Sequence, residues 1–251
     1  SNNRLIKTFA HHLCKHTFEK YGNIYLSCSD LASNWMFRKS TVCNGKIYLL
    51  RNGIDLTRFR YDKNKRQLNR LEINVTDEIV IGHIGRFDFA KNHDFLIDVF
   101  YEFHKQNNNS VLLLVGEGDN MTSIKSKVEK LCISDSVIFY GTTNKIPELL
   151  FAMDVFLLPS FFEGNPVVGI EAQAASLPCF FSDTISRMCQ LTNNVQYLSI
   201  NSNPKIWADA IINCLKIYQR KNSISLLKGK GYDIKEVANF LMTLYENEIK
   251  K

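Results

Sequence analysis

Two glutamates, Glu163 and Glu171, stand eight positions apart in the segment FFEGNPVVGIEAQAASLP, residues 161–178. A carboxylate can accept hydrogen bonds from two hydroxyl groups at once. One of the two glutamates can therefore bind the hydroxyls of a sugar, and the other can bind the diol of a ribose. The intervening Gly-Asn-Pro, residues 164–166, predicts a tight turn, a capping side chain and a first helical residue. A helix that starts in this way presents backbone N–H groups that attract phosphate.

A guanidinium and an ammonium group follow another strand-like segment. Arg86 comes after the apolar residues 79–84 through Gly85, and Lys91 lies five residues further on, at the expected start of the next helix. Both side chains can reach a diphosphate and neutralise its charge as a nucleotide departs. Two surface cations near a helix start are the structural alternative, but cations there oppose the helix dipole.

Apolar segments alternate with amphipathic ones along most of the chain, which predicts βαβ units in a parallel sheet. We expect strands at residues 79–84, 111–115, 136–140, 155–159, 178–182 and 195–199. We expect helices at residues 92–106, 119–132, 145–152, 166–176, 204–219 and 233–249. The fold class is therefore α/β, a Rossmann-like, doubly wound parallel sheet. The glutamates follow the carboxyl end of a strand, where open α/β sheets bind ligands.

The first fifty residues do not fit comfortably into this sheet. Their pattern predicts four short elements: a helix over 4–21, a strand at 24–28, a helix at 30–39 and a strand at 47–50. We therefore set residues 1–50 apart from residues 51–251, which contain the Rossmann-like pattern.

The spacing of Glu163 and Glu171 resembles the E-x7-E signature of retaining GT-B glycosyltransferases of family four, the "group 1" transferases, especially those that build bacterial capsular polysaccharides and exopolysaccharides. Five further segments are similar in order and spacing: RNGIDLTRF (51–59), IGHIGRFDFAKNH (81–93), VLLLVGEGD (111–119), VIFYGTT (137–143) and VFLLPSFFEG (155–164). Together they cover roughly the whole chain from residue 24 onward, so the resemblance is far more specific than any single motif.

The resemblance implies roles for particular residues toward a nucleotide-sugar donor. Glu163, Arg86 and Lys91 are the expected catalytic residues, with Arg86 and Lys91 on the diphosphate and Glu163 on the sugar hydroxyls. The expected donor-binding residues are Arg86, Lys91, Gly116, Tyr140, Glu163, Gly164, Asn165, Pro166, Val167 and Glu171. Transfer in this family is described as front-face attack, so the glutamates are not expected to act as a glycosidase pair. The alternative is that both glutamates are solvated residues near a helix end.

The resemblance also implies an activity and its partners. It implies a metal-independent, retaining glycosyltransferase that moves a sugar from a nucleoside diphosphate, expected to be UDP, to a lipid-linked or growing polysaccharide acceptor. No cofactor and no metal are expected. Residues 1–50 resemble the end of the acceptor-binding domain, and residues 51–251 resemble the donor-binding domain. A complete enzyme of this kind would need about another domain's worth of residues ahead of Ser1.

Composition favours a globular, cytoplasmic protein. Hydrophobic residues make up 45% of the 251, and the seven cysteines include no CxxC pair, which disfavours a disulfide framework or a thiolate zinc site. The neighbouring His11, His12 and His16 lack an acidic or cysteine partner at ligand spacing and predict a polar helix face. No apolar run has membrane-spanning length.

The net charge of +6 is spread along the chain without a nucleic-acid-binding motif. Two basic concentrations, residues 58–70 and 216–230, predict solvated surface. Peripheral contact with anionic lipid at the inner face of the plasma membrane is the alternative for these two segments.

Two other functions fit less of the sequence. A nucleotide- or sugar-binding module without catalysis would use the same site residues. A dinucleotide-dependent oxidoreductase is disfavoured, because no G-x-G-x-x-G opens a helix after the first strand of the sheet.

Overall fold

The computed structural model describes residues 10, 11, 14 and 17–249, which leaves His12 and His16 outside the described residues. The chain forms two compact units, Ser1–Gly53 with Ile234–Lys251, and Ile54–Asp233. The division thus falls three residues after the expected boundary at residue 50. It also groups the C-terminal helix with the first unit, whereas we expected that helix in the Rossmann-like domain.

The first unit contains a small parallel sheet of β1 (Tyr25–Ser27) and β2 (Ile47–Leu49). Between them, the expected helix over 30–39 is divided into α2 (Asp30–Met36) and α3 (Lys39–Cys43). The cause is Glu19, which lies within the short helix η1 (Phe18–Lys20) and is only 5% exposed, because its carboxylate accepts hydrogen bonds from Arg38 and Thr41 at the start of α3. The unit also includes α11 (Ile234–Ile249).

The second unit is built on a six-stranded parallel sheet with the order β5-β4-β3-β6-β7-β8. The bounds of these strands are Ile79–Ile84 for β3, Ser110–Val115 for β4, Val137–Gly141 for β5, Val155–Leu158 for β6, Cys179–Ser182 for β7 and Val195–Leu198 for β8. All six expected strands are thus confirmed. The chain runs outward from β3 to β5 and then restarts on the other side at β6, so the order reverses between β3 and β6. Such a reversal creates a crevice at the carboxyl ends of the two strands.

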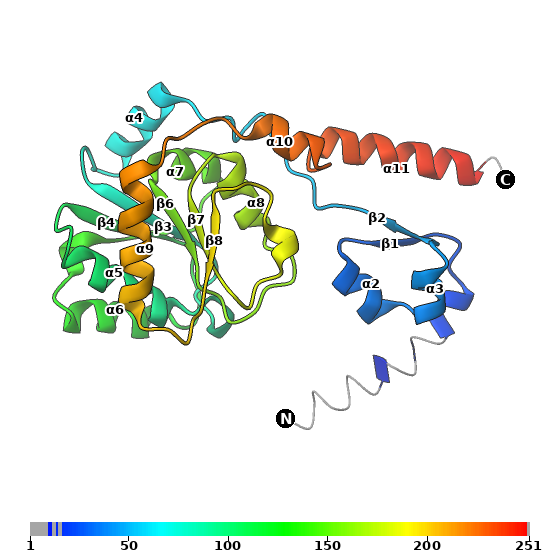
Figure 1. Cartoon of the computed structure of the whole chain (residues 1–251), viewed down its shortest axis with the longest axis horizontal. Helices are drawn as coiled ribbons and strands as arrows, with labels where there is room; N and C mark the ends of the chain where they lie inside the picture. Colours follow the sequence, from blue (N-terminus) through cyan, green and yellow to red (C-terminus); the bar gives the residue numbers. More distant parts are fainter. Residues whose placement is uncertain (1–9, 12–13, 15–16, 250–251) are drawn as a thin grey trace. The chain divides into compact units, whose positions relative to one another are not determined.

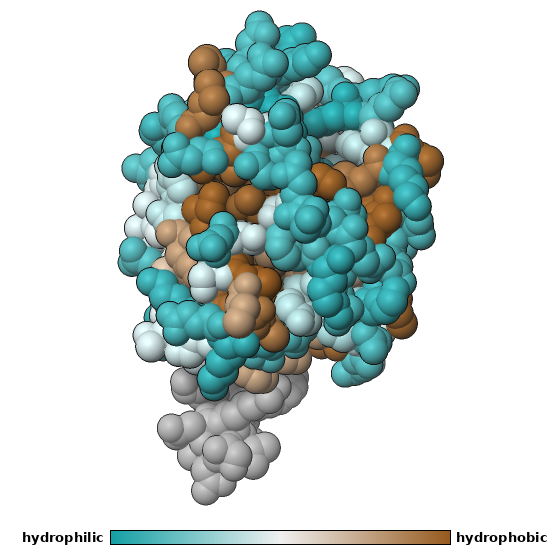
Figure 2. Space-filling model, turned by 90° about the vertical axis from the view of Figure 1, so that its left-hand side faces the viewer, coloured by the Kyte–Doolittle hydropathy of each residue, from teal (hydrophilic) through white to brown (hydrophobic). Residues whose placement is uncertain are grey.

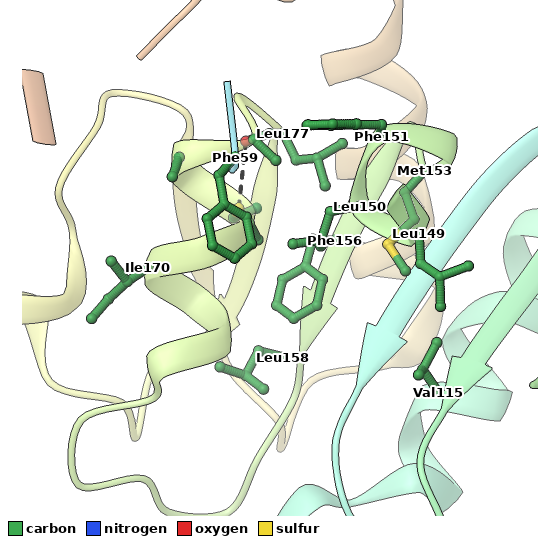
Figure 3. Close-up of a cluster of buried hydrophobic side chains, with 14 of the residues drawn as sticks. Phe59, Val115, Leu149, Leu150, Phe151, Met153, Phe156, Leu158, Ile170 and Leu177 are labelled. Atoms are coloured by element: carbon green, nitrogen blue, oxygen red, sulfur yellow. Dashed lines mark hydrogen bonds between the residues drawn. The ribbon is translucent and has the colours of Figure 1, made fainter. Parts of the chain in front are cut away.

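Helices cover both faces of this sheet (Figure 1). One face packs on α5 (His93–His104), α6 (Met121–Lys130) and α9 (Pro204–Ile217), with Phe100, Phe103 and Trp207 fully buried. The other packs on α7 (Ile146–Ala152), α8 (Val167–Ala174) and α10 (Ile224–Gly229). The side chains between β6 and α7 are apolar and interdigitated (Figure 3). This two-sided core explains why the strands read as continuous apolar runs.

The apolar pattern of the sequence did not predict two helices in this unit, α4 (Lys63–Glu72) and α10. Asp62 starts α4, because its carboxylate accepts from the backbone N–H groups of Asn64 at 2.8 Å and Lys65 at 3.0 Å. The buried face of α4 carries arginine rather than leucine, whereas Leu68 and Leu71 are exposed. A helix of this kind gives no apolar stripe toward the core, so periodicity does not predict it.

Three arginines hold α4, α7 and the segment after α9 together. Arg66 donates to the carbonyls of Phe151, Ala152 and Met153, and its second nitrogen binds Asp154 at 2.6 Å. Arg70 binds Ala152, Asp154 and Glu78, and Arg220 donates to Leu150, Phe151, Met153 and Ala175. The final carbonyls of α7, which lack intrahelical donors, are thereby satisfied. The contacts with Glu78 and Asp154, which precede β3 and β6, anchor α4 at the amino ends of these strands.

The face shown in Figure 2 is mainly hydrophilic, with brown apolar areas between the teal side chains. None of the helices within the described part of the chain has the length and apolar character needed to span a membrane.

Candidate functional site at the reversal of strand order

The loops that follow β3 and β6 meet at the carboxyl ends of these strands, where the strand order reverses. The backbone N–H of Phe161 donates to the carbonyl of Ala90 at 2.8 Å, and the side-chain amide of Asn92 donates to the carbonyl of Pro159 at 3.1 Å. These bonds fix the two loops against each other. Residues that are 72 positions apart in the chain are therefore held in one site.

Lys91 and Glu163 form an ion pair at this junction. The Lys91 Nζ atom lies 2.6 Å from Glu163 Oε1, and the two side chains are only 18% and 13% exposed. The same oxygen accepts a hydrogen bond from Ser160 Oγ at 2.8 Å. The structure thus brings together the expected diphosphate ligand and the expected sugar ligand, which share one charge-assisted contact.

Ser160 is a residue of this site that the sequence did not reveal. It is fully buried, and its carbonyl accepts hydrogen bonds from Ser182 Oγ at 2.6 Å and Thr184 Oγ1 at 2.9 Å. The turn after β6 is therefore anchored to the turn after β7. A serine that precedes an acidic residue by three positions is the available signal, but it is too common to be decisive.

Lys91 is positioned by its own loop. It closes the short helix η2 (Phe89–Lys91), and its backbone N–H donates to Asp88 at 3.2 Å. Asn92 then adopts a left-handed conformation with φ 54°, and α5 begins only at His93. Lys91 therefore lies two residues before the first residue of α5, and not at the start of that helix as expected.

Backbone hydrogen bonds join the loop after β3 to the loop after β4. Gly85 and Phe87 donate to the carbonyls of Val115 and Glu117, both at 2.9 Å. Gly116 and Gly118 have φ values of 135° and 157°, and a β carbon on either would collide with a carbonyl of the β3 loop. Only glycine fits these two positions, because both the backbone conformation and the close approach exclude a side chain. Gly116, an expected donor-binding residue, thus shapes the loop that carries Arg86.

Arg86 is exposed at this same edge of the sheet. Its carbonyl accepts from the backbone N–H of Asp88 at 2.8 Å, which fixes the loop while the guanidinium faces solvent. An exposed cation on a rigid loop can bind an anion with little cost in backbone entropy.

The start of α8 differs from the expected one. Pro166, rather than Asn165, occupies the capping position, and the first helical residue is Val167. Asn165 Oδ1 instead lies 3.9 Å from the thiol of Cys189. A proline has no side-chain acceptor, so the first N–H groups of α8 receive no cap from it and point away from the helix. Gly164, at the preceding turn, has open space around it.

Glu171 lies within α8 and is partly buried. Burial raises the pKa of its carboxyl group, and the nearby positive charge of Arg58 opposes that rise. A carboxylate held with incomplete solvation is ready to accept hydroxyl groups from a ligand. Arg58 was not among the expected site residues.

Two neutral histidines lie beneath the loop of Arg86 and Lys91. His83 is fully buried, and its Nδ1 lies 2.8 Å from the carbonyl of Leu157, so that Nδ1–H is the donor. His93 stacks on Phe87 at 4.0 Å and meets His83 edge-on at 4.8 Å. Burial lowers the pKa of His93 to about 4, with Asp88 opposing and Lys91 reinforcing the change. The pair is therefore an uncharged support at neutral pH.

Tyr140 lies on β5, which β4 and β3 separate from β6. Its side chain lines a hollow of about 510 Å³ together with Ile73, Val75 and Phe139. The next residue, Gly141, accepts a hydrogen bond at its carbonyl from Gly116, which ties the end of β5 to the β4 loop. Within the part of the chain that the structure describes, no three His, Cys, Asp or Glu residues are grouped to hold a metal ion.

Comparisons with known proteins give a consistent result. The family model "Glycosyl transferases group 1" matches residues 64–225. EpsF of Bacillus subtilis (strain 168), a protein named as a glycosyltransferase, is 30% identical over 229 residues, which are 90% of this chain and 60% of EpsF. The Escherichia coli UDP-Gal:alpha-D-GlcNAc-diphosphoundecaprenol alpha-1,3-galactosyltransferase is 31% identical over 68% of this chain and 44% of its own length.

Solved structures support the fold. The crystal structure of Anabaena Alr3699/HepE in complex with UDP and glucose superposes with a TM-score of 0.78 at 18% identity, over 95% of this chain and 67% of that one. The chain thus spans about half to two thirds of the proteins that it matches. The expected α/β, Rossmann-like fold and the resemblance to group 1 transferases are both confirmed.

Proposed function

The chain belongs to the glycosyl transferase group 1 family, and on this premise we propose that its second unit, residues 54–233, binds the nucleotide sugar from which a glycosyltransferase takes its sugar. The Lys91–Glu163 pair carries the proposal, because it joins a cation for the diphosphate to a carboxylate for sugar hydroxyls at the reversal of strand order. Two relatives whose names describe sugar transfer also support this proposal.

The donor is arranged along the carboxyl edge of the sheet. Arg86 and Lys91 bind the diphosphate and stabilise the charge that develops as the nucleotide leaves. Glu163 binds the donor sugar, and Glu171 accepts the ribose hydroxyls. The first N–H groups of α8, from Val167 onward, add partial positive charge. These cations replace a metal ion, so the transfer is metal-independent, and the sugar keeps its anomeric configuration.

UDP is the proposed nucleotide, and a lipid-linked or growing polysaccharide is the proposed acceptor. Solved relatives hold UDP, and the E. coli relative is named for a diphosphoundecaprenol-linked acceptor. We place the reaction in the cytoplasm at the inner face of the membrane, where such an acceptor is exposed. Residues 1–50, with the helix α11, belong to the acceptor side of the enzyme.

Isothermal titration with UDP, GDP and ADP in the presence of EDTA tests the donor site. UDP is expected to bind selectively, and Glu171→Gln and Lys91→Met are each expected to weaken it by about tenfold or more, as loss of a charge-assisted hydrogen bond requires. Lys105→Met, which removes an exposed lysine from the end of α5, is the matched control. Equal affinity of wild type and both site variants for UDP would refute the assignment.

A non-catalytic nucleotide-binding module is the second candidate, because it would use the same donor-binding residues, among them the paired Lys91 and Glu163. Release of UDP from UDP-sugars in the presence of a diphosphoundecaprenol-linked sugar separates the two functions. Turnover that disappears in Glu163→Gln supports the enzyme, whereas UDP binding without turnover in the longest form of the protein supports the module.

A further inference from the structure

Two stacked phenylalanines border the Lys91–Glu163 pair. The rings of Phe89 and Phe161 lie 4.7 Å apart with an angle of 16° between their planes. Phe89 opens the short helix that Lys91 closes, and Phe161 precedes Glu163 by two residues. The hydrogen bond from the Phe161 N–H to the Ala90 carbonyl holds the two backbones together at this point. The stacked rings are therefore part of the same rigid junction as the ion pair.

Phe89 offers an open aromatic face to solvent. Its side chain is 69% exposed although Phe161 covers one side of the ring, so the accessible surface is mainly the opposite face and the edge. The neighbouring Phe162 is 61% exposed. Exposed apolar groups that cluster beside polar ones on a rigid loop are typical of a ligand-binding surface.

We propose that the open face of Phe89 is a subsite for a pyranose ring of the acceptor glycan. This inference rests on the proposed function and adds the chemistry of the group that receives the sugar. The axial C–H groups of a pyranose form a flat patch with partial positive charge, and the face of a phenyl ring carries partial negative charge. The hydroxyls at the rim of the same sugar find polar partners in the adjacent loops.

The position of Phe89 favours the acceptor over the donor. Lys91 and Glu163 are 18% and 13% exposed and lie inside the crevice, where the leaving group and the donor sugar belong. Phe89 lies on the solvent side of the same loop. A ring stacked there lies next to the donor sugar and can present a hydroxyl to it.

Two other ligands fit the observations less well. A nucleobase also stacks on aromatic rings, but Tyr140, the aromatic residue among the expected donor-binding residues, lies on β5, which β4 separates from β3. A lipid chain needs a broad apolar surface, whereas Asp88 and Lys91 flank Phe89 in its loop. The combination of one flat ring and several polar groups matches a carbohydrate.

Saturation-transfer difference NMR with methyl glycosides of glucose, galactose and N-acetylglucosamine, recorded with saturating UDP, tests the subsite. At least one glycoside is expected to receive saturation at the C–H protons of one ring face. Phe89→Leu keeps the apolar bulk without the aromatic face and is expected to weaken this binding by about threefold to tenfold. Phe89→Trp is expected to retain it. Leu68→Ala, which removes an exposed apolar side chain from α4, is the control.

Other outcomes overturn the inference or separate it from the donor site. Glycoside binding that is absent in wild type, or unchanged in Phe89→Leu, removes the sugar subsite. A loss of UDP affinity in Phe89→Leu shows that the ring stacks the base. Binding to phosphatidylglycerol vesicles that Phe89→Leu retains and Phe89→Ala loses identifies a lipid contact. If UDP fails to bind while glycoside binding still depends on Phe89, the donor site is refuted and the sugar subsite stands.

Discussion

Lys91 and Glu163 neutralise each other across 2.6 Å, although each is expected to bind a different part of the donor. In this structure a carboxylate of the same chain therefore compensates part of the positive charge of the Lys91 ammonium. A diphosphate that enters the crevice competes with Glu163 for this ammonium. Under the proposed function, the pair is therefore expected to set how strongly the site attracts a nucleotide before any sugar is present.

We expect Glu163→Gln and Lys91→Met to change UDP affinity in opposite directions. Removing the carboxylate charge releases the ammonium, so Glu163→Gln is expected to bind UDP about twofold to tenfold more tightly. Lys91→Met loses the cation and is expected to bind UDP about tenfold more weakly. Titration of both variants measures the effect, and a loss of UDP affinity in Glu163→Gln contradicts it. Wild type is expected to bind UDP-sugar more tightly than UDP. This difference in affinity is expected to be smaller in Glu163→Gln, because the contact between residue 163 and the sugar is weaker.

Gly116→Ala is expected to destabilise the second unit by about 2–4 kcal/mol. The new methyl group would collide with the Gly85 carbonyl in a conformation with positive φ, and the hydrogen bonds between the β3 and β4 loops would open. Gly164→Ala is the matched control, because nothing lies within 4 Å of a β carbon at that position. Urea unfolding measures both variants, and equal stability losses would show that the packing of these loops contributes little.

Arg220→Leu is expected to lower the free energy of unfolding by about 3–5 kcal/mol, because three carbonyls at the end of α7 and the carbonyl of Ala175, after α8, lose a partly buried guanidinium donor. Arg220→Lys is expected to rescue only part of this loss, since one ammonium cannot reproduce the planar fork. Lys221→Leu serves as the control at an exposed neighbour. Chemical denaturation gives the comparison, and full rescue by lysine would show that charge alone is sufficient.

Acid is expected to destabilise the second unit through its buried histidines. The pKa of His93 falls from its ordinary 6.5 to about 4 on folding, and that of His83 falls well below 6.5, so the unfolded chain binds these protons first. Stability is therefore complete above pH 6.5 and declines as the pH falls toward 4, by up to about 1.4 kcal/mol per pH unit for each histidine.

His93→Phe tests this origin of the acid sensitivity. The phenyl ring keeps the stacking on Phe87 and cannot be protonated, so unfolding measured at pH 7, 6 and 5 is expected to show a shallower dependence. Asp88 and Lys91 act on His93 and remain in the variant. An unchanged slope would assign the acid sensitivity to other groups.

The sheet was predictable because β4, β6 and β7 are buried, largely apolar runs, and β3, β5 and β8 are shorter or partly buried versions of the same pattern. The six strands agree to within one or two residues, and so do most helices on its faces. Helix α4 was not predictable from apolar periodicity, since Arg66 and Arg70 point inward to carbonyls of α7. The division of the expected helix at residues 30–39 depends on Glu19, a contact between distant positions that local pattern does not contain.

The candidate site was predictable in its residues and less so in its contacts. The motif spacing selected Lys91 and Glu163, but their pairing depends on the meeting of two loops 72 residues apart. Asn165 was assigned to cap α8 from its residue type, whereas the chain turns one residue later and Pro166 takes that position. Ser160 and Arg58 act through neighbours in space, and their residue types alone do not distinguish them.

Ser160 holds the turn after β6 through its backbone carbonyl, which accepts the hydroxyls of Ser182 and Thr184. The anchoring of this turn to the turn after β7 therefore does not depend on the exposed side chain of Phe162. A substitution at this position is expected to change the surface next to Glu163 with little effect on folding. Position 162 is thus a natural place for exchanging residues between relatives to change the ligand that the proposed site prefers.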